Sequence, residues 1–273
     1  WGQAAFYPIV LKPLFMSSLK VSVTFACGVA CGLLLAKLHK RNRKRRQEQI
    51  ERQMSAWYSS TRTIYAIGRN YVAHAHELGN AVPTKPFWFI KPASSIVPSG
   101  SAHRCFPGRT ESHHELELGV IIGTMASKVS PDVAMDHVAG YCLALDMTDR
   151  EGQNEAKKAG KPWTQAKGWD TSCPVSEMVP KSRVADPSKL NMWLQVKGEE
   201  KPRQEGPTSL MIFNVPQLIS AVSHVHTLHV GDLILTGTPE GVGAVKPGDV
   251  VEAGIKELDL TLTIEVVASD SKL

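Results

Sequence analysis

Two glutamates separated by a single residue mark the stretch from residue 113 to 123. Glu115 and Glu117 alternate with Leu116 and Leu118, and an apolar run follows. Strict alternation predicts a β-strand in which residues i and i+2 share a face, so both carboxylates point one way while both leucines enter the core. Two like charges about 7 Å apart on a half-buried strand are costly to desolvate. A divalent cation such as Mg²⁺, Ca²⁺ or Mn²⁺ would remove that cost, whereas a solvated edge strand would need no ion.

A third acid follows the next apolar run. Residues 139–145 have the composition of a buried strand, and Asp146 comes directly after them. Together with Glu115 and Glu117 it would complete a set of three oxygen ligands for Mg²⁺, with further coordination positions left for water or substrate. The sequence therefore predicts a metal site built from these three acids.

A candidate general base lies earlier in the chain. Residues 72–78 are predicted to form a short helix closed by Gly79. On a helix His74 and Glu77 stand at positions i and i+3 and share a face. A histidine oriented by a carboxylate can activate water as a general base, although the same spacing also fits a surface ion pair. A metal pair of His74 and His76 would require a strand here and is disfavoured.

Further polar residues follow the third acid. Arg150 and Gln153 fall in the first turns of a predicted helix, and Lys167 lies in a polar and aromatic loop at 163–170, where it either stabilises charge or is simply solvated. A glycine-rich segment with Thr238 can offer backbone N–H groups and hydroxyls to an anionic ligand. It lacks the Gly-Lys-Ser/Thr of a Walker loop.

The elements that would position these residues are mostly strands. We expect strands at 63–68, 86–92, 190–196, 247–255 and 258–267, short helices at 130–138 and 215–225, and a polar segment at 203–209. The chain has no internal repeat. This pattern favours an α+β, strand-rich fold over a doubly wound sheet.

Charge and cysteine content limit the function classes. The 273 residues carry a net charge of +5, but residues 1–54 hold ten Lys and Arg against two Glu, a net +8, and the remainder has 21 bases and 24 acids, a net −3. The acidic body therefore gives no reason to expect a nucleic-acid partner. Five scattered cysteines indicate a reducing compartment, without a disulfide framework or a zinc site.

Residues 1–54 form a basic leader with an apolar segment at 21–36, followed by a linker. The apolar segment has no charged residue but is shorter than the ~20 residues that span a bilayer. Seven of the ten residues at 37–46 are basic, on the flank that the positive-inside rule keeps in the cytosol. Three explanations stay open: a membrane anchor through residues 21–36, a mitochondrial-type targeting segment, or a misassigned start of the reading frame.

Seven ordered motifs resemble those of the fumarylacetoacetate hydrolase family. They are G-R-N-Y with His74 and Glu77, H-H-E-L-E-L-G, L-D-M-T-x-R-x-x-Q, W-T-x-A-K, C-P-V, G-x-x-x-x-R-Q and T-G-T-P-x-G-V-G, spread over residues 64–254. The nearest likeness is to the mitochondrial, acylpyruvase-type members that also decarboxylate oxaloacetate. The resemblance implies one catalytic domain at 55–273, a β-roll of twisted mixed sheets, a homodimer and a mitochondrial location, in the matrix or anchored through the leader.

The resemblance also assigns roles to residues. It implies Mg²⁺ or Mn²⁺ on the three acids, His74 and Glu77 as the water-activating pair, Lys167 as a catalytic charge stabiliser, and an α-keto acid substrate. The residues expected to bind that substrate are Arg69, Arg150, Gln153 and Thr238. One departure is Glu151, where the family pattern has Asp, and we expect little effect on the chemistry. His113 and His114 are left with structural roles.

The activity implied is hydrolysis of acylpyruvates, such as acetylpyruvate or fumarylpyruvate, to pyruvate and a carboxylic acid, together with oxaloacetate decarboxylation. Three alternatives remain. Two belong to the same family: an oxaloacetate tautomerase, and a hydrolase or isomerase of aromatic catabolism. The third is a membrane-tethered ligand-binding protein without turnover.

Overall fold

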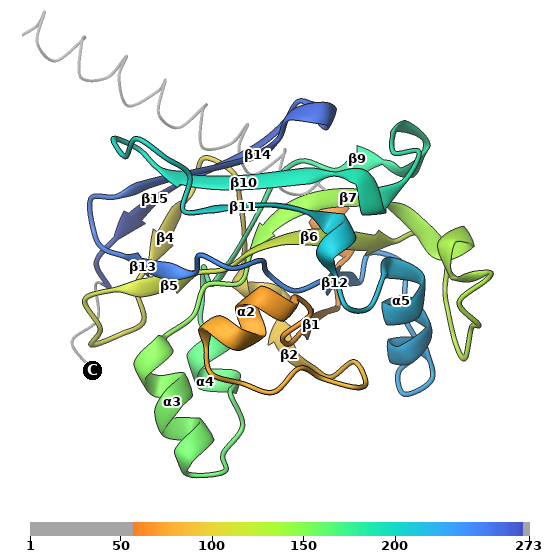
Figure 1. The fold of residues 1–273 in the computed structure, drawn as a ribbon, viewed down its shortest axis with the longest axis horizontal. Coiled ribbons are helices and arrows are strands. Elements are labelled where there is room, and N and C mark those ends of the chain that lie inside the picture. The colour runs from red at the N-terminus through yellow and green to blue at the C-terminus, as the bar shows by residue number, and fades with distance from the viewer. Residues whose placement is uncertain (1–56, 270–273) are drawn as a thin grey trace, which may run out of the picture. The chain divides into compact units, whose positions relative to one another are not determined.

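The computed structural model describes residues 57–269. Strands dominate it, joined by short helices (Figure 1). The strands are β1 Thr63–Ile67, β2 Trp88–Pro92, β3 Ile96–Pro98, β4 Ala102–Arg104, β5 Ser112–His114, β6 Leu116–Ile122, β7 Val138–Leu145, β8 Cys173–Val175, β9 Val179–Pro180, β10 Asn191–Val196, β11 Gln204–Pro207, β12 Leu233–Leu235, β13 Gly243–Val245, β14 Val250–Ile255 and β15 Leu260–Val267.

Two larger mixed sheets form the body. Within the described residues the first sheet has the order β2-β1-β12-β6-β7-β8-β3, with β9 also paired to β7. The second has the order β11-β10-β14-β15-β4, and a short ribbon pairs β13 with β5. Most neighbours are antiparallel, but β1 runs parallel to β12, β3 to β8 and β4 to β15. The central position of β6 and β7 in the first sheet explains why both strands are almost wholly apolar.

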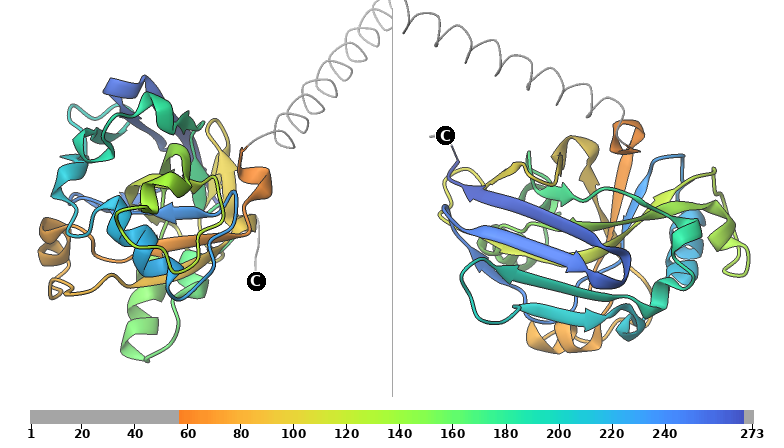
Figure 2. Two further views of the ribbon diagram at one scale, coloured as in Figure 1. Left: turned by 90° about the vertical axis from the view of Figure 1, so that its right-hand side faces the viewer. Right: turned by 90° about the horizontal axis from the view of Figure 1, so that it is seen from above.

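The second sheet covers one face of the first, and the main core lies between them (Figures 1 and 2). From β6, Leu116, Leu118 and Val120 enter this core, where they meet side chains of the second sheet such as Leu194 and Ile264. The intervening positions of β6 face the other way, because side chains alternate along a strand. This alternation puts the carboxylate of Glu117 on the face opposite the main core.

Helices α2, α3 and α4 lie on that opposite side of the first sheet, as Figure 1 shows. The α-helices are α2 Val72–Glu77, α3 Arg150–Lys158, α4 Thr164–Lys167 and α5 Val215–Ser223. Asp149 caps α3, since its side chain accepts a hydrogen bond from the backbone N–H of Gly152 at 3.2 Å. Asn214 and Gln217 form a capping box that starts α5. Short 3₁₀ helices complete the connections: η1 Trp57–Ser60, η2 Ala93–Ser95, η3 Ala134–His137, η4 Lys181–Arg183, η5 Pro187–Lys189, η6 Thr208–Leu210 and η7 Lys256–Leu258.

The predicted fold class is confirmed: the described chain is a strand-rich α+β domain of twisted mixed sheets with short helices. Several local predictions were wrong. The strand expected through residues 113–123 breaks at Glu115, because β5 leaves to pair with β13 while β6 joins the first sheet. The helix expected at 130–138 is only the single turn η3, and the loop expected at 163–170 contains α4. The polar segment at 203–209, for which the sequence predicted no element, contains β11.

The leader at residues 1–54 lies outside the described residues, so its three explanations and the domain boundary near residue 55 stay predictions. From Trp57 to residue 269, no helix is both long and apolar enough to cross a membrane.

Candidate active site

The three acids meet at one edge of the β6–β7 pair. These strands are antiparallel with Leu116 opposite Leu145, so Glu115 and Asp146 lie next to each other just beyond the paired residues. The backbone N–H of Asp146 donates to the carbonyl of Glu115 at 2.8 Å. One oxygen from each carboxylate of Glu115, Glu117 and Asp146 lies within 4.8 Å of the others, and all three side chains are buried.

This donor set suits a hard divalent cation. Three buried carboxylate oxygens from rigid strand ends match the ligand preference of Mg²⁺ and Mn²⁺, and no sulfur or imidazole joins them in the part of the chain that the structure describes. Protein cations partly compensate the negative charge. Lys167 Nζ lies 2.8 Å from Glu115 Oε2 and 2.7 Å from Asp146 Oδ2, and it also donates to the Thr148 hydroxyl at 2.6 Å.

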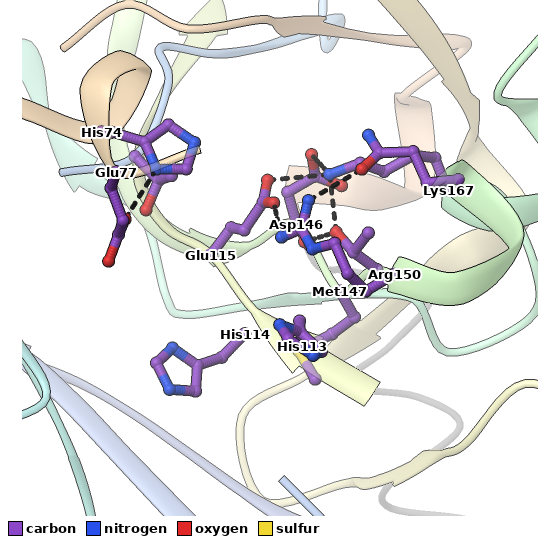
Figure 3. A network of polar contacts seen from close by, with 12 residues as sticks. His74, Glu77, His113, His114, Glu115, Asp146, Met147, Arg150 and Lys167 are labelled. Atoms are coloured by element: carbon purple, nitrogen blue, oxygen red, sulfur yellow. Dashed lines mark hydrogen bonds and ion pairs between the residues drawn. The ribbon is translucent and has the colours of Figure 1, made fainter. Parts of the chain in front are cut away.

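Two further cations complete the compensation, as Figure 3 shows in part. Arg150 pairs with Glu115 and donates to Gln153 Oε1 at 2.7 Å. Lys91, which sequence reasoning did not identify, lies 2.8 Å from Asp146 Oδ1 and is fully buried. A signal for Lys91 was present: a lysine inside an aromatic strand must either reach solvent or find a carboxylate.

The acids differ in how they hold a proton. For Glu117, burial and the neighbouring Asp146 and Glu115 carboxylates raise the pKa well above its ordinary value. For Glu115, burial alone would raise the pKa, but Lys167 and Arg150 outweigh it and lower the pKa. Burial would likewise lower the pKa of Lys167, which Asp146 and Glu115 instead raise, so its ammonium stays charged. Glu117 is therefore the acid of this cluster that takes up a proton most readily when no metal ion balances the charge.

His74 of α2 lines the same cleft, and Glu77 from the end of that helix lies beside it. His74 Nδ1 lies 3.2 Å from Glu77 Oε2. Because an ionised carboxylate only accepts hydrogen bonds, this contact places the imidazole proton on Nδ1 and leaves Nε2 as the basic nitrogen. The other oxygen, Glu77 Oε1, accepts from the backbone N–H of Gly241 at 3.0 Å. The spacing of three residues along a helix thus gives an oriented pair rather than a surface ion pair, since His74 is buried.

The remaining predicted site residues also line this cleft. Arg69, Arg150, Gln153, Lys167 and Thr238 surround the acid cluster together with His74. All ten residues predicted from the sequence are therefore brought together, because Glu77 joins them through His74.

Gln204 is a buried hub that sequence reasoning did not single out. Its Nε2 donates to the Thr238 hydroxyl at 2.8 Å and to the Pro239 carbonyl at 2.9 Å. Its Oε1 accepts from the backbone N–H of Leu116 at 3.0 Å and lies 2.9 Å from His114 Nδ1. The hub joins the glycine-rich loop to the start of β6. His114 faces Gln204 rather than the acids, and burial lowers its pKa to about 4, which fits the predicted structural role.

The cleft is narrow in this structure. Its volume is about 30 Å³, which is room for about two water molecules. An α-keto acid is larger, so its binding requires the long basic side chains at the rim to rearrange. A roomier hollow of about 420 Å³ lies elsewhere, between η5, η6 and the start of α5, but it lacks an acid cluster or a histidine. We place the chemistry at the narrow cleft because the titratable groups converge there.

Residues 63–265 match the family described as fumarylacetoacetate (FAA) hydrolase C-terminal. The chain belongs to the fumarylacetoacetate hydrolase family. Two relatives extend the likeness over most of their own length. A human mitochondrial oxaloacetate tautomerase, FAHD1, is 49% identical over 216 residues, which cover 79% of this chain and 96% of the relative. A mitochondrial oxaloacetate decarboxylase of Dictyostelium discoideum is 46% identical over 215 residues, 78% of this chain and 98% of the relative.

Solved structures of this family have the same fold. The fumarylpyruvate hydrolase from Pseudomonas aeruginosa, solved with Mn²⁺ and pyruvate, matches with a TM-score of 0.71 and 38% identity over 77% of this chain and 91% of the other. A 5-carboxymethyl-2-hydroxymuconate delta-isomerase from Mycobacterium smegmatis matches with a TM-score of 0.68 and 34% identity over 77% and 80% of the two chains. Membership of a family of enzymes is thereby established.

The relatives also bear on location and cofactor. Both relatives above are named mitochondrial proteins, which confirms the mitochondrial location predicted from the sequence. A divalent metal is bound by the Pseudomonas member, and the buried acid cluster of this chain has the ligands to hold one.

Proposed function

We propose that this chain is a divalent-metal-dependent enzyme that generates the enolate of an α-keto acid, from acylpyruvates by hydrolysis and from oxaloacetate by decarboxylation. The observation that carries the proposal is the position of His74, hydrogen-bonded to Glu77, at the same cleft as three converging buried carboxylates. An acid cluster alone would serve a structural ion, and the base gives it a chemical use.

Glu115, Glu117 and Asp146 would hold Mg²⁺ or Mn²⁺. When bound, the ion would supply Lewis-acid stabilisation of the negative charge that develops on the keto oxygen. The choice of Mg²⁺ for the natural enzyme is part of the proposal, because both ions accept this donor set.

The basic side chains would bind and orient the substrate. The ammonium of Lys167 is buried and charged beside the acids, so it can contact the carboxylate or the developing oxyanion of an α-keto acid. Arg150 and Gln153, already hydrogen-bonded to each other, present N–H donors to the same space. Arg69 and Thr238 complete the lining, with the Thr238 hydroxyl oriented by Gln204.

His74 would move the proton. For an acylpyruvate, its free Nε2 removes a proton from water, which attacks the carbonyl distal to the keto acid while Glu77 stabilises the imidazolium. Oxaloacetate decarboxylation needs no water, because loss of CO₂ leaves the same enolate. A base at this position could also remove a proton from C3 of oxaloacetate, and the names of the relatives favour such tautomerisation as the second candidate activity.

Rates of the purified full-length chain on acetylpyruvate, fumarylpyruvate and oxaloacetate would test the proposal. We expect turnover with Mg²⁺ or Mn²⁺ that EDTA abolishes. His74→Ala should reduce acylpyruvate cleavage far more than decarboxylation. If no substrate is turned over with metal, the proposed activity is wrong; if His74→Ala cleaves acylpyruvates at the wild-type rate, the assigned base is wrong.

The assembly is part of the same proposal. We expect a homodimer with a small-molecule α-keto acid as its ligand and no nucleic acid. Membrane association through residues 21–36 and a matrix location remain the two alternatives for the leader. Fractionation of mitochondria that contain a C-terminally tagged full-length chain separates them, because a matrix enzyme is released by sonication and an anchored one stays with the membrane pellet.

A further inference from the structure

One face of α3 carries Lys157 into the cleft, and none of the roles proposed above involves this lysine. Arg150, Gln153 and Lys157 stand at positions i, i+3 and i+7 of this helix, so they share a face, and all three line the cleft. Arg150 is paired with Glu115. Lys157 is half-buried but has no carboxylate partner among residues 57–269, and its neighbour Lys158 is exposed on another face.

Arg69 is a second cation of this kind at the rim. It too lacks a carboxylate partner within the described chain, and its backbone adopts a φ of +55°, a conformation that side-chain-bearing residues rarely adopt. Such strain persists where the surrounding structure holds it and is often found at binding sites.

Aromatic rings connect the two cations. The Arg69 guanidinium lies 5.5 Å from the centre of the Phe87 ring, and Lys157 Nζ lies 5.2 Å from the centre of the Trp163 ring. Phe87 and Trp163 meet edge to face at 6.4 Å. The close approach of Phe87 depends on Gly68, since a Cβ there would lie 2.3 Å from the ring. Cation–π contacts of this type hold a charge in place without neutralising it.

The arrangement leaves positive charge uncompensated. Burial lowers the pKa of Lys157, and the like charges of Arg150 and Arg69 lower it further, which together outweigh the opposing effect of the Glu115 carboxylate. Two partly desolvated, mutually repelling cations are costly in the free enzyme, and an anion between them would offset that cost. Arg150 and Lys167 already face the acid cluster, where the α-keto acid end of a substrate belongs, so the opposite end of that substrate extends towards the rim.

We infer that Lys157 and Arg69 form a carboxylate-binding subsite that reads the far end of the substrate and makes the enzyme prefer dicarboxylic over monocarboxylic acylpyruvates. The inference rests on the proposed function, because it assumes that the α-keto acid end binds at the acid cluster. It names the substrate class that the acid cluster and the His74–Glu77 pair leave open.

Two acylpyruvates that differ only at the far end test the inference. Fumarylpyruvate ends in a carboxylate where crotonylpyruvate ends in a methyl group. With the full-length enzyme and Mn²⁺, we expect a higher kcat/KM for fumarylpyruvate. Lys157→Met should lower the ratio of the two kcat/KM values about tenfold, as expected for one charged hydrogen bond at a partly solvated site, mainly through the KM of fumarylpyruvate.

Two further variants separate charge from position. Lys158→Met removes the adjacent lysine, which lies on the exposed side of α3, and should leave the ratio at the wild-type value. Lys157→Arg keeps the charge and should retain most of the preference. A Lys157→Met ratio equal to that of the wild type overturns the inference alone, provided that the wild type cleaves both compounds. If the wild type cleaves neither compound, the proposed acylpyruvate hydrolysis is wrong, and this inference is wrong with it.

Discussion

Lys91 Nζ lies 2.8 Å from Asp146 Oδ1, and both side chains are shut off from solvent. Lys91 comes from β2 at the edge of the first sheet, whereas Asp146 follows β7 near its centre. The same ammonium donates to the backbone carbonyl of Lys167. One buried lysine therefore fixes both a proposed metal ligand and the start of the segment that follows Lys167.

Replacing Lys91 should destabilise the protein. Lys91→Met leaves Asp146 buried with Lys167 as its remaining cation, and removal of one partner of a buried ion pair costs about 3 kcal/mol. Urea unfolding in EDTA measures the loss, with Lys85→Met as the control because Lys85 is exposed. Mn²⁺ should restore part of the difference, since it neutralises the same carboxylate. Equal stability of the two variants in EDTA would contradict the assigned role.

Glu117→Gln should separate metal binding from stability. The raised pKa of Glu117 means that burial and the neighbouring carboxylates favour its neutral form in the metal-free protein, so a neutral Gln there should leave the unfolding temperature in EDTA near that of the wild type. Mn²⁺ at a hundredfold excess over its Kd should stabilise the folded wild type by about 2.7 kcal/mol and so raise its unfolding temperature. The unfolding temperature of the variant should rise far less. Glu265→Gln, at an exposed position of β15, should respond as the wild type does. A full metal-induced shift in Glu117→Gln would remove Glu117 from the ligand set.

Gly241→Ala should impair hydrolysis through Glu77. Gly241 has a φ of +91°, and a Cβ there would lie 1.9 Å from the carbonyl oxygen of Arg203, so the loop must move. Its N–H would then leave Glu77, and a misplacement of about 1 Å in a catalytic pair costs about a hundredfold in rate. Gly248→Ala is the matched control: its φ is +98°, but nothing lies within 4 Å of the added Cβ. Steady-state kcat for acetylpyruvate measures the effect, and circular dichroism checks that both variants are folded. Equal kcat values for the two variants would contradict the prediction.

His103 should contribute to a loss of stability in mild acid. Its ring is buried, Nδ1 lies 2.9 Å from the carbonyl of Thr171, and Nε2 has no partner. Burial lowers its pKa to about 4, with Lys91 acting in the same direction, whereas the unfolded chain keeps a value near 6.5. The contribution of neutral His103 to the free energy of unfolding is therefore complete above pH 6.5 and is lost as the pH falls towards 4. The free energy of unfolding falls by about 3 kcal/mol over this range.

A non-titrating variant isolates this contribution. His103→Asn can keep the hydrogen bond to Thr171, so the difference in unfolding free energy between wild type and variant should shrink as the pH is lowered from 6.5 to 4.5. Urea titrations across that range measure it. A difference that stays constant with pH would show that His103 does not titrate on unfolding.

Much of the site was accessible from the sequence because its signals are local. The alternation around Glu115 and Glu117 and the apolar run before Asp146 depend only on neighbouring residues, as does the helical spacing of His74 and Glu77. The structure brings all of them together. The break at Glu115 was missed because the partner of β5 is β13, far away in the chain, and no local pattern reports such a partner.

Lys157 illustrates an intermediate case. Its spacing from Arg150 and Gln153 along α3 is visible in the sequence and places it on the same helical face. Its lack of a carboxylate partner within residues 57–269 and the ring of Trp163 beside it depend instead on how α3 packs against the segment that follows. A local pattern can place a residue on a face, but it cannot say what that face meets.

The sequence by itself determined the strand-rich fold class and the family, and it singled out the three acids and the candidate histidine base, since each rests on residue type and short-range spacing. Only the tertiary structure decided what holds them in place: Lys91 against Asp146, 55 residues apart, and Gly241 against Glu77, 164 residues apart. The physical reason is that a buried charge takes whichever partner the packed chain brings within hydrogen-bond distance. That choice follows from sheet order and loop path, which short-range spacing does not encode.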